Sequence, residues 1–353
     1  MRRERQVTSW GVQMKEEWRT QLERADNKRK PHSSRATKIP LRLSVLWVLC
    51  AFAASGCVLT MGSPPGAGPV PTRSSDIVVA AFDFSESELL AQLYGQALRE
   101  SGLPVQILGG GGSREVLEPA LEQGLIDVIP EYQGALLNFL GLNQGPTDAR
   151  PPAATHRALQ RELGDRGLHA LEFSKAENKN EFVVTAETAS LLGLRAISDL
   201  ASIASELVMG GPPECELRPL CLQGLENVYG LKFESFQAFD ASGPHTVSAL
   251  HGGEIDVALM FTTDPAIDEN NLVVLRDDRG LQPSENVVPV VRQAVMDRYG
   301  STFAGALDSV SMRLNRRELV ELNKQVAAGA EPADVAGEWL AANRISAYQE
   351  ASS

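Results

Sequence analysis

Short apolar runs alternate along the chain with segments whose apolar residues recur at helical spacing. Residues 76–84 form one such run, rich in β-branched side chains, which predicts a buried strand. The next segment carries leucines and alanines every three or four positions, and Ser85 and Glu88 have the spacing of a capping box. We therefore predict a helix that begins at Ser85 and ends at Gly102.

The alternation continues with a second apolar run at 104–108, a glycine-rich loop, a helix capped by Ser113 and a third apolar run at 126–132. A β-α-β-α-β order gives a parallel sheet with helices on both faces, so the predicted fold class is α/β. The four glycines at 109–112 lack the Gly-Lys-Ser/Thr of a phosphate-binding loop, and we interpret them as a turn.

One sequence pattern occurs twice in the chain and predicts two similar lobes. "ALEQGLIDVIPEY" (120–132) and "ALHGGEIDVALMF" (249–261) share Ala-Leu-x-x-Gly-x-Ile-Asp-Val, and each has an aromatic residue five positions after the Asp. Between them, apolar runs and helical segments alternate again. Ligands of open α/β sheets bind beyond the carboxyl ends of the strands. We therefore expect the two aromatic residues, Tyr132 and Phe261, to face a cleft between two lobes.

The first 56 residues differ from the rest of the chain in charge. They hold 12 Lys and Arg against 5 Asp and Glu, a net charge of +7. The whole chain has 33 basic and 45 acidic residues, which leaves 21 basic and 40 acidic residues, a net charge of −19, in the remainder. A body this acidic argues against nucleic acid as a partner, because phosphate contacts need clustered Lys and Arg.

An export signal is predicted within residues 1–56. Basic residues precede an apolar run at 43–54, which has the length of a signal-peptide h-region and is too short to span a bilayer. The segment before this run is long for an n-region, and a start codon assigned too far upstream would explain its length.

The sequence "ASGC" (54–57) follows directly and resembles the bacterial lipobox, which makes Cys57 the lipidated first residue of the mature chain. Ordinary secretory cleavage nearby is the alternative. Residues 57–75 are rich in Pro, Gly and Ser, which predicts a flexible tether between the lipid anchor and the folded body. We expect the protein at the outer face of the cytoplasmic membrane.

Two cysteines remain in the body, Cys215 and Cys221, within "PPECELRPLC". In an exported chain, cysteines this close in a Pro-containing loop indicate a disulfide. A metal site is the alternative, but no His lies near them in sequence, and two thiolates do not complete a tetrahedral set. The chain also lacks Gly-x-Ser-x-Gly and His-Glu-x-x-His motifs. We therefore predict no catalytic residues and no metal or cofactor site.

Several longer segments together resemble one family of transport proteins. They are "FDFSESELLAQLYGQAL", "LGGGGSREVLEPALEQGLIDVIPEYQGALLNFLG", "FTTDP" and "LVVLRDDRGLQPSENVVPVVR". In this order they resemble the substrate-binding proteins of ABC importers for glycine betaine, carnitine, choline and related osmoprotectants. The resemblance implies a two-lobed periplasmic-binding-protein fold of type II, in which two doubly wound α/β lobes enclose a ligand cleft. Lobe 1 would comprise 76–175 and 280–353, and lobe 2 would comprise 176–279.

The resemblance also implies an aromatic cage with Tyr132 as one wall. A quaternary ammonium group cannot donate hydrogen bonds, so proteins hold it with the faces of aromatic rings. Phe182 and Phe261 stand where the family often has Tyr, and both keep a ring face without the hydroxyl. The alternative for each phenylalanine is a place in the core. Ser284 stands where some members have another Tyr, which would remove one wall.

Arg218 matches a family arginine that grips the ligand carboxylate, a task suited to its planar fork of donors. A solvated loop arginine is the alternative. The other expected ligand contacts are Asn180, Phe84, Ser85, Thr262, Thr263 and Asp264. The last three of these have an alternative role in capping the next turn.

Together these features predict a monomeric, lipid-anchored solute receptor. It would capture glycine betaine or a related quaternary-ammonium osmoprotectant, close by hinge motion and deliver the ligand to an ABC permease. Three alternatives remain open. The same fold could bind a polyol, sugar or amino acid, or it could serve as a sensory receptor. An enzyme on a similar fold would need catalytic groups that we do not find in the sequence.

Overall fold

The computed structural model describes residues 76–141 and 150–343. All of them belong to one compact unit, Pro71–Ser353. The predicted export signal, Cys57 and the tether lie outside the described residues. No helix in the described part of the chain is both long enough and apolar enough to cross a membrane.

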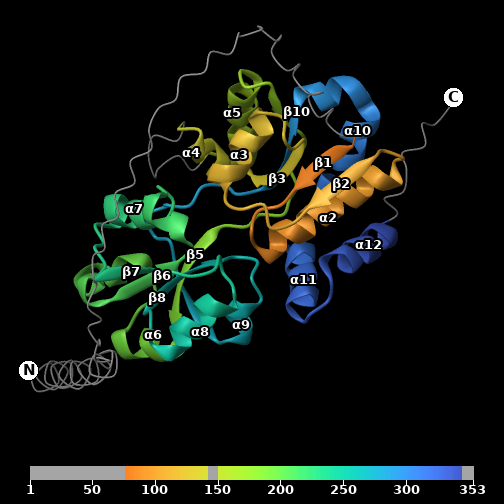
Figure 1. The fold of residues 1–353 in the computed structure, drawn as a ribbon. Coiled ribbons are helices and arrows are strands. Elements are labelled where there is room, and N and C mark those ends of the chain that lie inside the picture. The colour runs from red at the N-terminus through yellow and green to blue at the C-terminus, as the bar shows by residue number, and fades with distance from the viewer. Residues whose placement is uncertain (1–75, 142–149, 344–353) are drawn as a thin grey trace, which may run out of the picture. The chain divides into compact units, whose positions relative to one another are not determined.

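The first sheet is built mainly from the N-terminal part of the body (Figure 1). Its strands are β1 (Ile77–Ala80), β2 (Val105–Leu108), β3 (Val128–Tyr132), β4 (Leu168–Ala170) and β10 (Val287–Arg292), in the order β2-β1-β3-β10-β4. The first three strands are parallel, as predicted. The remaining pairs are not, because β10 arrives from the far end of the chain and runs antiparallel to both β3 and β4.

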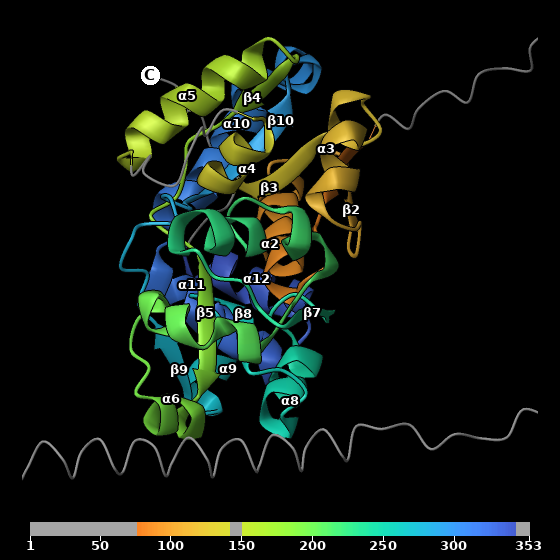
Figure 2. The ribbon, with the colours of Figure 1, turned by 90° about the vertical axis from the view of Figure 1, so that its left-hand side faces the viewer.

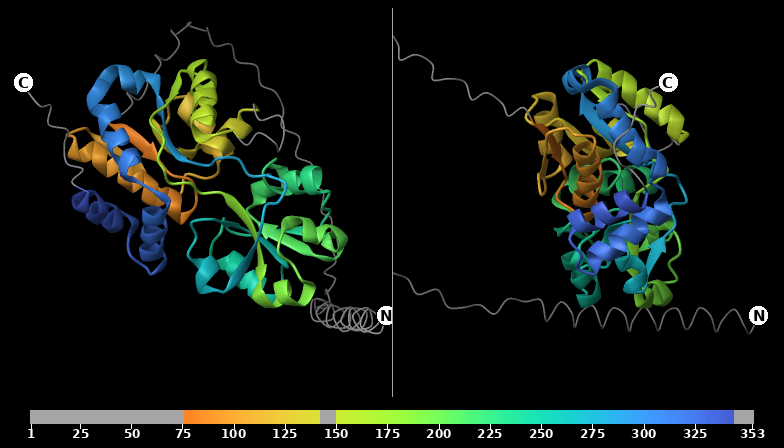
Figure 3. Two further views of the ribbon diagram at one scale, coloured as in Figure 1. Left: turned by 180° about the vertical axis from the view of Figure 1, so that it is seen from behind. Right: turned by 90° about the vertical axis from the view of Figure 1, so that its right-hand side faces the viewer.

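Helices cover both faces of this sheet. They are α2 (Ser85–Glu100), α3 (Arg114–Glu122), α4 (Gln133–Phe139), α5 (Pro152–Gly164), α10 (Gln293–Arg313), α11 (Arg316–Ala327) and α12 (Pro332–Ala342). Alternate residues of a strand point to opposite faces. Accordingly, Ile77 and Val79 pack with α2, α10, α11 and α12, whereas Val78 and Ala80 pack with α3, α4 and α5. Figure 2 shows α3, α4 and α5 together, and Figure 3 shows α11 and α12 beside α2.

Helix α2 begins at Ser85, as predicted, but its cap differs from the prediction. The N-cap residue is Phe84, one position before Ser85, and no side chain caps the helix, so the predicted capping box is wrong. The hydroxyl of Ser87 instead accepts a hydrogen bond from the Phe82 backbone at 2.8 Å. This bond holds the segment after β1 against the first turn of α2.

The second sheet repeats the topology of the first. Its strands are β5 (Asn180–Thr185), β6 (Val208–Gly211), β7 (Ser235–Ala238), β8 (Val257–Phe261) and β9 (Leu272–Leu275), in the order β7-β6-β8-β5-β9. Strands β7, β6 and β8 are parallel, and β5 runs antiparallel to both of its neighbours, as β10 does in the first sheet. The sequence did not predict β7, because this short edge strand is only partly buried and lacks an apolar run.

Short helices surround the second sheet. They are α6 (Ala186–Leu192), α7 (Leu222–Gly224), α8 (Pro244–Gly252) and α9 (Ala266–Glu269), with 3-10 turns η1 (Ile197–Ser202), η2 (Ala204–Glu206) and η3 (Pro213–Leu217) and the π-helical turn η4 (Leu225–Tyr229). The chain crosses between the sheets in extended segments, after β4 at 171–179 and after β9 at 276–286 (Figure 1). The two segments meet in a bridge between Glu177 and Asn286.

The repeated sequence pattern makes the same hydrogen bonds in both sheets. In the first sheet, the backbone N–H of Val78 donates to the Asp127 carboxylate at 3.0 Å, and the backbone N–H of Asp127 donates to the Val78 carbonyl at 2.8 Å. In the second sheet, Val208 and Asp256 exchange the same pair of bonds, both at 2.8 Å. Each repeated Asp therefore fixes the register between the strand that it precedes and the neighbouring parallel strand.

We expect Asp256→Ala to lower the free energy of unfolding by about 1–3 kcal/mol, because the buried N–H of Val208 loses its charged acceptor. Asp256→Asn keeps one acceptor oxygen and should cost clearly less. Denaturant unfolding of both variants measures the difference. Equal losses in the two variants would show that the charge of Asp256 matters and that this hydrogen bond does not.

Candidate ligand-binding site

A cavity of about 750 Å³ lies between the two sheets and receives side chains from both. Tyr132 ends β3, Phe261 ends β8, and both side chains line the cavity. A second cavity of about 1030 Å³ adjoins it and shares Phe84 and Phe261 as walls. The duplicated strand ends thus converge on one inter-lobe space, as expected for open α/β sheets.

Aromatic rings from the two lobes form one cluster at this boundary. The ring centroid of Phe84 lies 5.2 Å from that of Phe261, at an interplanar angle of 47°, and 6.3 Å from that of Tyr132, at 28°. Phe82 also stacks with Phe84, at a centroid distance of 6.3 Å and an interplanar angle of 4°. Three of the residues predicted for the site, Phe84, Tyr132 and Phe261, therefore come together, and Phe84 is the central ring.

Phe182 lies elsewhere. It is 1% exposed in the middle of β5, opposite Leu259 of β8 and Leu275 of β9, and it lines neither cavity. Two residues earlier, at the start of the same strand, Asn180 does line the smaller cavity. Phe182 therefore occupies the core position that the sequence left open as its alternative.

Glu86 is hydrogen-bonded to Tyr132 of the aromatic cluster and was not among the predicted site residues. Its side chain is buried, and its carboxylate accepts four hydrogen bonds. The donors are the hydroxyl of Tyr132 (2.6 Å), the amide of Asn178 (2.7 Å), the hydroxyl of Thr263 and the amide of Asn323 (2.6 Å). Burial and the nearby Glu86 carboxylate raise the pKa of the Tyr132 hydroxyl well above its usual value.

The sequence did contain a signal for Glu86. It lies three and four positions before Leu89 and Leu90, which are fully buried, so it falls on the apolar face of α2. A carboxylate on such a face needs several donors, since burying an unpaired charge is costly. Those donors come from distant segments, and helical periodicity alone cannot identify them.

The three residues after Phe261 bond within the protein. Thr262 donates to Asn178 at 3.2 Å and accepts from the backbone of Lys179 at 2.9 Å. Thr263 donates to Glu86, as described above. Asp264 accepts from the Ala266 backbone at 2.8 Å and from the hydroxyl of Ser242, which is the turn-capping role given as its alternative. Thr263, Asp264 and the exposed Ser85 line the larger cavity.

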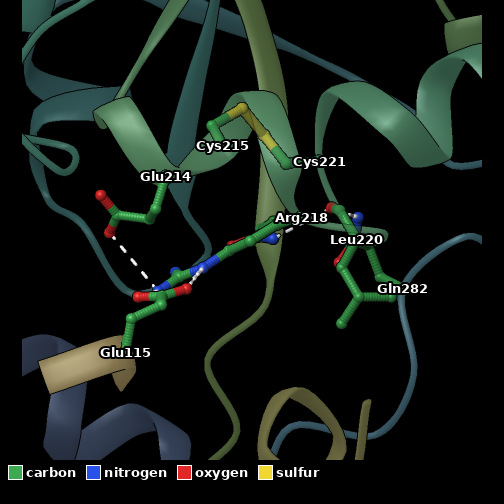
Figure 4. Close-up of a disulfide and its surroundings, with 8 residues drawn as sticks. Glu115, Glu214, Cys215, Arg218, Leu220, Cys221 and Gln282 are labelled. Carbon is green, nitrogen blue, oxygen red and sulfur yellow. Dashed lines mark hydrogen bonds and ion pairs between the residues drawn. A yellow bond between two sulfur atoms is a disulfide. The ribbon is translucent and has the colours of Figure 1, made fainter. Parts of the chain in front are cut away.

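Arg218 reaches from the second lobe to the first (Figure 4). Its guanidinium donates to the two carboxylate oxygens of Glu115 on α3, at 3.2 and 3.0 Å, and lies 3.5 Å from Glu214. Burial acts to raise the pKa of the Glu115 carboxyl, but hydrogen bonds from Arg218 and Ser113 outweigh it and hold this pKa at about 2. The arginine predicted to grip a ligand carboxylate therefore already holds a carboxylate of the protein.

The loop that carries Arg218 is held at several points. A disulfide joins Cys215 and Cys221 on either side of it. The carbonyl of Leu220 accepts hydrogen bonds from Asn180 at 3.1 Å and from Gln282 at 2.9 Å. Asn180 is the first residue of β5, directly after the first crossing segment, and Gln282 lies on the second crossing segment, so the loop is tied to the ends of both crossings.

The walls of the two cavities are negatively charged. Among the described residues that line the larger cavity, none is Lys or Arg. Five are acidic: Asp83, Glu86, Glu88, Asp240 and Asp264. In the smaller cavity, both arginines have carboxylate partners. Arg218 pairs with Glu115, and Arg114 pairs with buried Glu131 through two bonds of 2.7 and 2.8 Å. The inter-lobe space therefore favours a cation over an anion.

Two further acids are buried, Glu118 on α3 and Glu285, which lines the smaller cavity. Burial, with a contribution from Glu131, raises the pKa of the Glu118 carboxyl to about 8, and neither of its oxygens has a hydrogen-bond partner among the described residues. Burial likewise raises the pKa of Glu285 to about 8, although the Ala135 backbone donates to it at 2.8 Å. Both carboxyls therefore favour the neutral form at neutral pH.

The arrangement of lobes, cavities and strand ends defines a class of protein. Two α/β lobes of equal topology, joined by crossing segments and enclosing a cleft at their strand ends, are the architecture of two-lobed solute-binding proteins. The chain belongs to the family described as the substrate binding domain of the ABC-type glycine betaine transport system, whose family model matches residues 75–342. Members of this family are binding proteins of transporters and not enzymes.

Individual relatives support this assignment. The glycine-betaine-binding protein of Pseudomonas aeruginosa is 30% identical over 280 residues, covering 76% of this chain and 88% of that protein. The ergothioneine transport permease/ergothioneine binding protein EgtU of Helicobacter pylori is 26% identical over 253 residues, covering 71% of this chain and 44% of that protein. A crystal structure described as a glycine betaine/carnitine/choline ABC transporter aligns with a TM-score of 0.59 at 24% identity, covering 76% of this chain and 99% of that one. The predicted family and two-lobed α/β fold are thereby confirmed.

We expect the stability of the wild-type protein to fall as the pH rises from about 4.5 to 8. In this range the unfolded chain has lost the Glu118 proton, whose ordinary pKa is 4.5, while the folded protein retains it. Each such group contributes a slope of about 1.4 kcal/mol per pH unit. Glu118→Gln should remove one contribution and flatten the curve. Denaturant unfolding at several pH values tests this, and parallel curves for the two proteins would contradict it.

Proposed function

We propose that this protein is an extracytoplasmic, lipid-anchored receptor of an ABC importer that captures glycine betaine or a related trimethylammonium compound. The observation that carries the proposal is the aromatic cluster of Phe84, Tyr132 and Phe261, which joins the strand ends of both lobes at the cleft. Closure of the lobes around the ligand would present the loaded form to a membrane permease. The lipid anchor is proposed at Cys57.

The chemistry of the cleft suits a quaternary ammonium group. Each ring face that contacts such a cation contributes about 0.5–2 kcal/mol, and the acidic lining adds long-range attraction. Centroids 5.2 Å apart leave no space for a trimethylammonium group between Phe84 and Phe261. Ligand binding must therefore separate these rings or use the faces that they turn to the cavities.

The carboxylate end of a betaine meets a different situation. Arg218 is the residue proposed to hold it, but Glu115 occupies the guanidinium. A ligand carboxylate would have to compete with Glu115 for this guanidinium, whereas a ligand without a carboxylate would leave the pair intact. This observation favours choline as a second candidate ligand beside glycine betaine.

Titration calorimetry of the purified protein tests the proposal. The panel comprises glycine betaine, choline, carnitine and ergothioneine, with polyols, sugars and amino acids as competing classes. Micromolar binding of a trimethylammonium compound would support the proposed function. If only a polyol, sugar or amino acid binds, the protein is still a solute receptor, but the proposed ligand class is wrong.

We expect Tyr132→Ala to abolish binding of the ligand that this panel identifies, because the variant loses both a ring face and the hydroxyl that contacts Glu86. Phe173→Ala is the matched control, since Phe173 is a half-buried aromatic residue that packs against the core of the first sheet and lines neither cavity. Calorimetry of both variants gives the comparison. Unchanged affinity in Tyr132→Ala would exclude the proposed site.

We expect Glu115→Gln to raise the affinity for glycine betaine relative to choline at least several-fold. The substitution frees the Arg218 guanidinium from its charged partner, so that a ligand carboxylate no longer has to compete with Glu115. Glu214→Gln is the control, because its contact with Arg218 is longer, at 3.5 Å. Equal changes for both ligands would show that Arg218 does not hold the carboxylate.

A further inference from the structure

The donors around the Glu86 carboxylate divide between its two oxygens. Oε1 accepts from the hydroxyl of Tyr132 and the amide of Asn178, and Oε2 accepts from Thr263 and Asn323. A carboxylate oxygen has about two lone-pair sites, so both oxygens are fully used. Glu86 therefore has no acceptor left for a ligand, although its side chain is part of the wall of the larger cavity.

The four donors come from four separate segments. Tyr132 ends β3, Asn178 lies on the first crossing segment, Thr263 follows β8 of the second sheet and Asn323 lies on α11. Glu86 itself lies in the first turn of α2. One carboxylate thus joins the first sheet, a crossing, the second sheet and the C-terminal helices.

Further contacts strengthen the link to the second sheet. The amide of Asn323 also donates to the backbone carbonyl of Thr263 at 3.2 Å. Arg316 of α11 donates to the backbone carbonyl of Thr262 at 3.0 Å. The segment after Phe261 is therefore bound to the same helix that holds Oε2 of Glu86, and it cannot shift relative to the first lobe without disturbing these bonds.

We propose that Glu86 is a positioning residue for ligand binding, which couples the ring of Tyr132 to the placement of the second lobe. A carboxylate is planar and rigid, and hydrogen bonds weaken steeply as their angles change. A movement of Thr263 turns or releases the carboxylate, and the same movement alters the bond to the Tyr132 hydroxyl on the other oxygen. Thr263 thereby controls a cage residue through Glu86 rather than through the ligand.

The coupling can be tested at two points. Thr263→Val removes the donor from the second lobe and leaves unchanged the two residues that form the bond between Glu86 and Tyr132. Glu86→Gln replaces one acceptor oxygen with an amide, which faces donors that it cannot satisfy. If Glu86→Gln fails to fold, Thr263→Val alone still tests the coupling. Asp308→Asn is the matched control, because Asp308 is a half-buried acid of the first lobe that accepts from the Glu172 backbone at 3.1 Å and lines neither cavity.

The state of Tyr132 can be read without any ligand. The chain has five tyrosines, so ¹³Cζ-tyrosine labelling gives few NMR signals, and Tyr132→Phe assigns the one of interest. We expect the Tyr132 signal to shift in Thr263→Val and Glu86→Gln and to stay in place in Asp308→Asn. An unmoved Tyr132 signal in both test variants would overturn the coupling.

Affinity for glycine betaine and choline, measured by calorimetry, is the second readout and rests on the proposed function. We expect at least a ten-fold loss in Glu86→Gln, a smaller loss in Thr263→Val and no loss in Asp308→Asn. Unchanged affinity in both test variants would overturn the positioning role even if the signal moves. If wild-type protein binds neither compound, the proposed function fails, and the NMR comparison still decides whether Glu86 couples Tyr132 to the second lobe.

Discussion

The geometry of the cleft depends on the buried carboxylate of Glu86. Removing a charge from water is costly unless hydrogen bonds replace its hydration, and here four donors do so. Because every donor comes from a different segment, none of these segments can shift without leaving a buried charge short of a partner. The hydroxyl of Tyr132 is one of the four donors, so this hydrogen bond connects the aromatic cluster to the Glu86 carboxylate.

Duplication of a local pattern explains why two lobes present similar strand ends. Asp127 and Asp256 make equivalent hydrogen bonds, and each sets the register of a short buried strand that ends in an aromatic residue. The strands carrying Tyr132 and Phe261 are therefore at the same place in two sheets of the same order. A cleft between such sheets receives a ring from each side, and Phe84 fills the space between them.

Electrostatics separates the two ends of a candidate ligand. The acidic lining and the ring faces provide for a cation without any rearrangement of charge. The cleft is less suited to bind an anionic group, because Arg114 and Arg218 are each already paired with a carboxylate of the protein. The carboxylate of a betaine would have to compete with Glu115 for Arg218, whereas choline, which has no carboxylate, would not.

Local pattern was sufficient for most of the fold. Strands buried on both faces appear in the sequence as unbroken apolar runs, so β1, β3 and β8 could be predicted, together with the helices between them. The edge strand β7 and the antiparallel direction of β10 could not, because the first lacks an apolar run and the second depends on a partner far away in sequence.

The chain by itself also determined which aromatic residues end the repeated strands, since the position of Tyr132 and Phe261 relative to the repeated Asp is a local feature. Only the tertiary structure decided that Phe84 joins them while Phe182 lies in the core, and that Glu115 holds Arg218. The physical reason is that residue type and spacing show that a side chain is apolar or charged. Its neighbours come from segments up to hundreds of residues away, and packing alone brings these segments together.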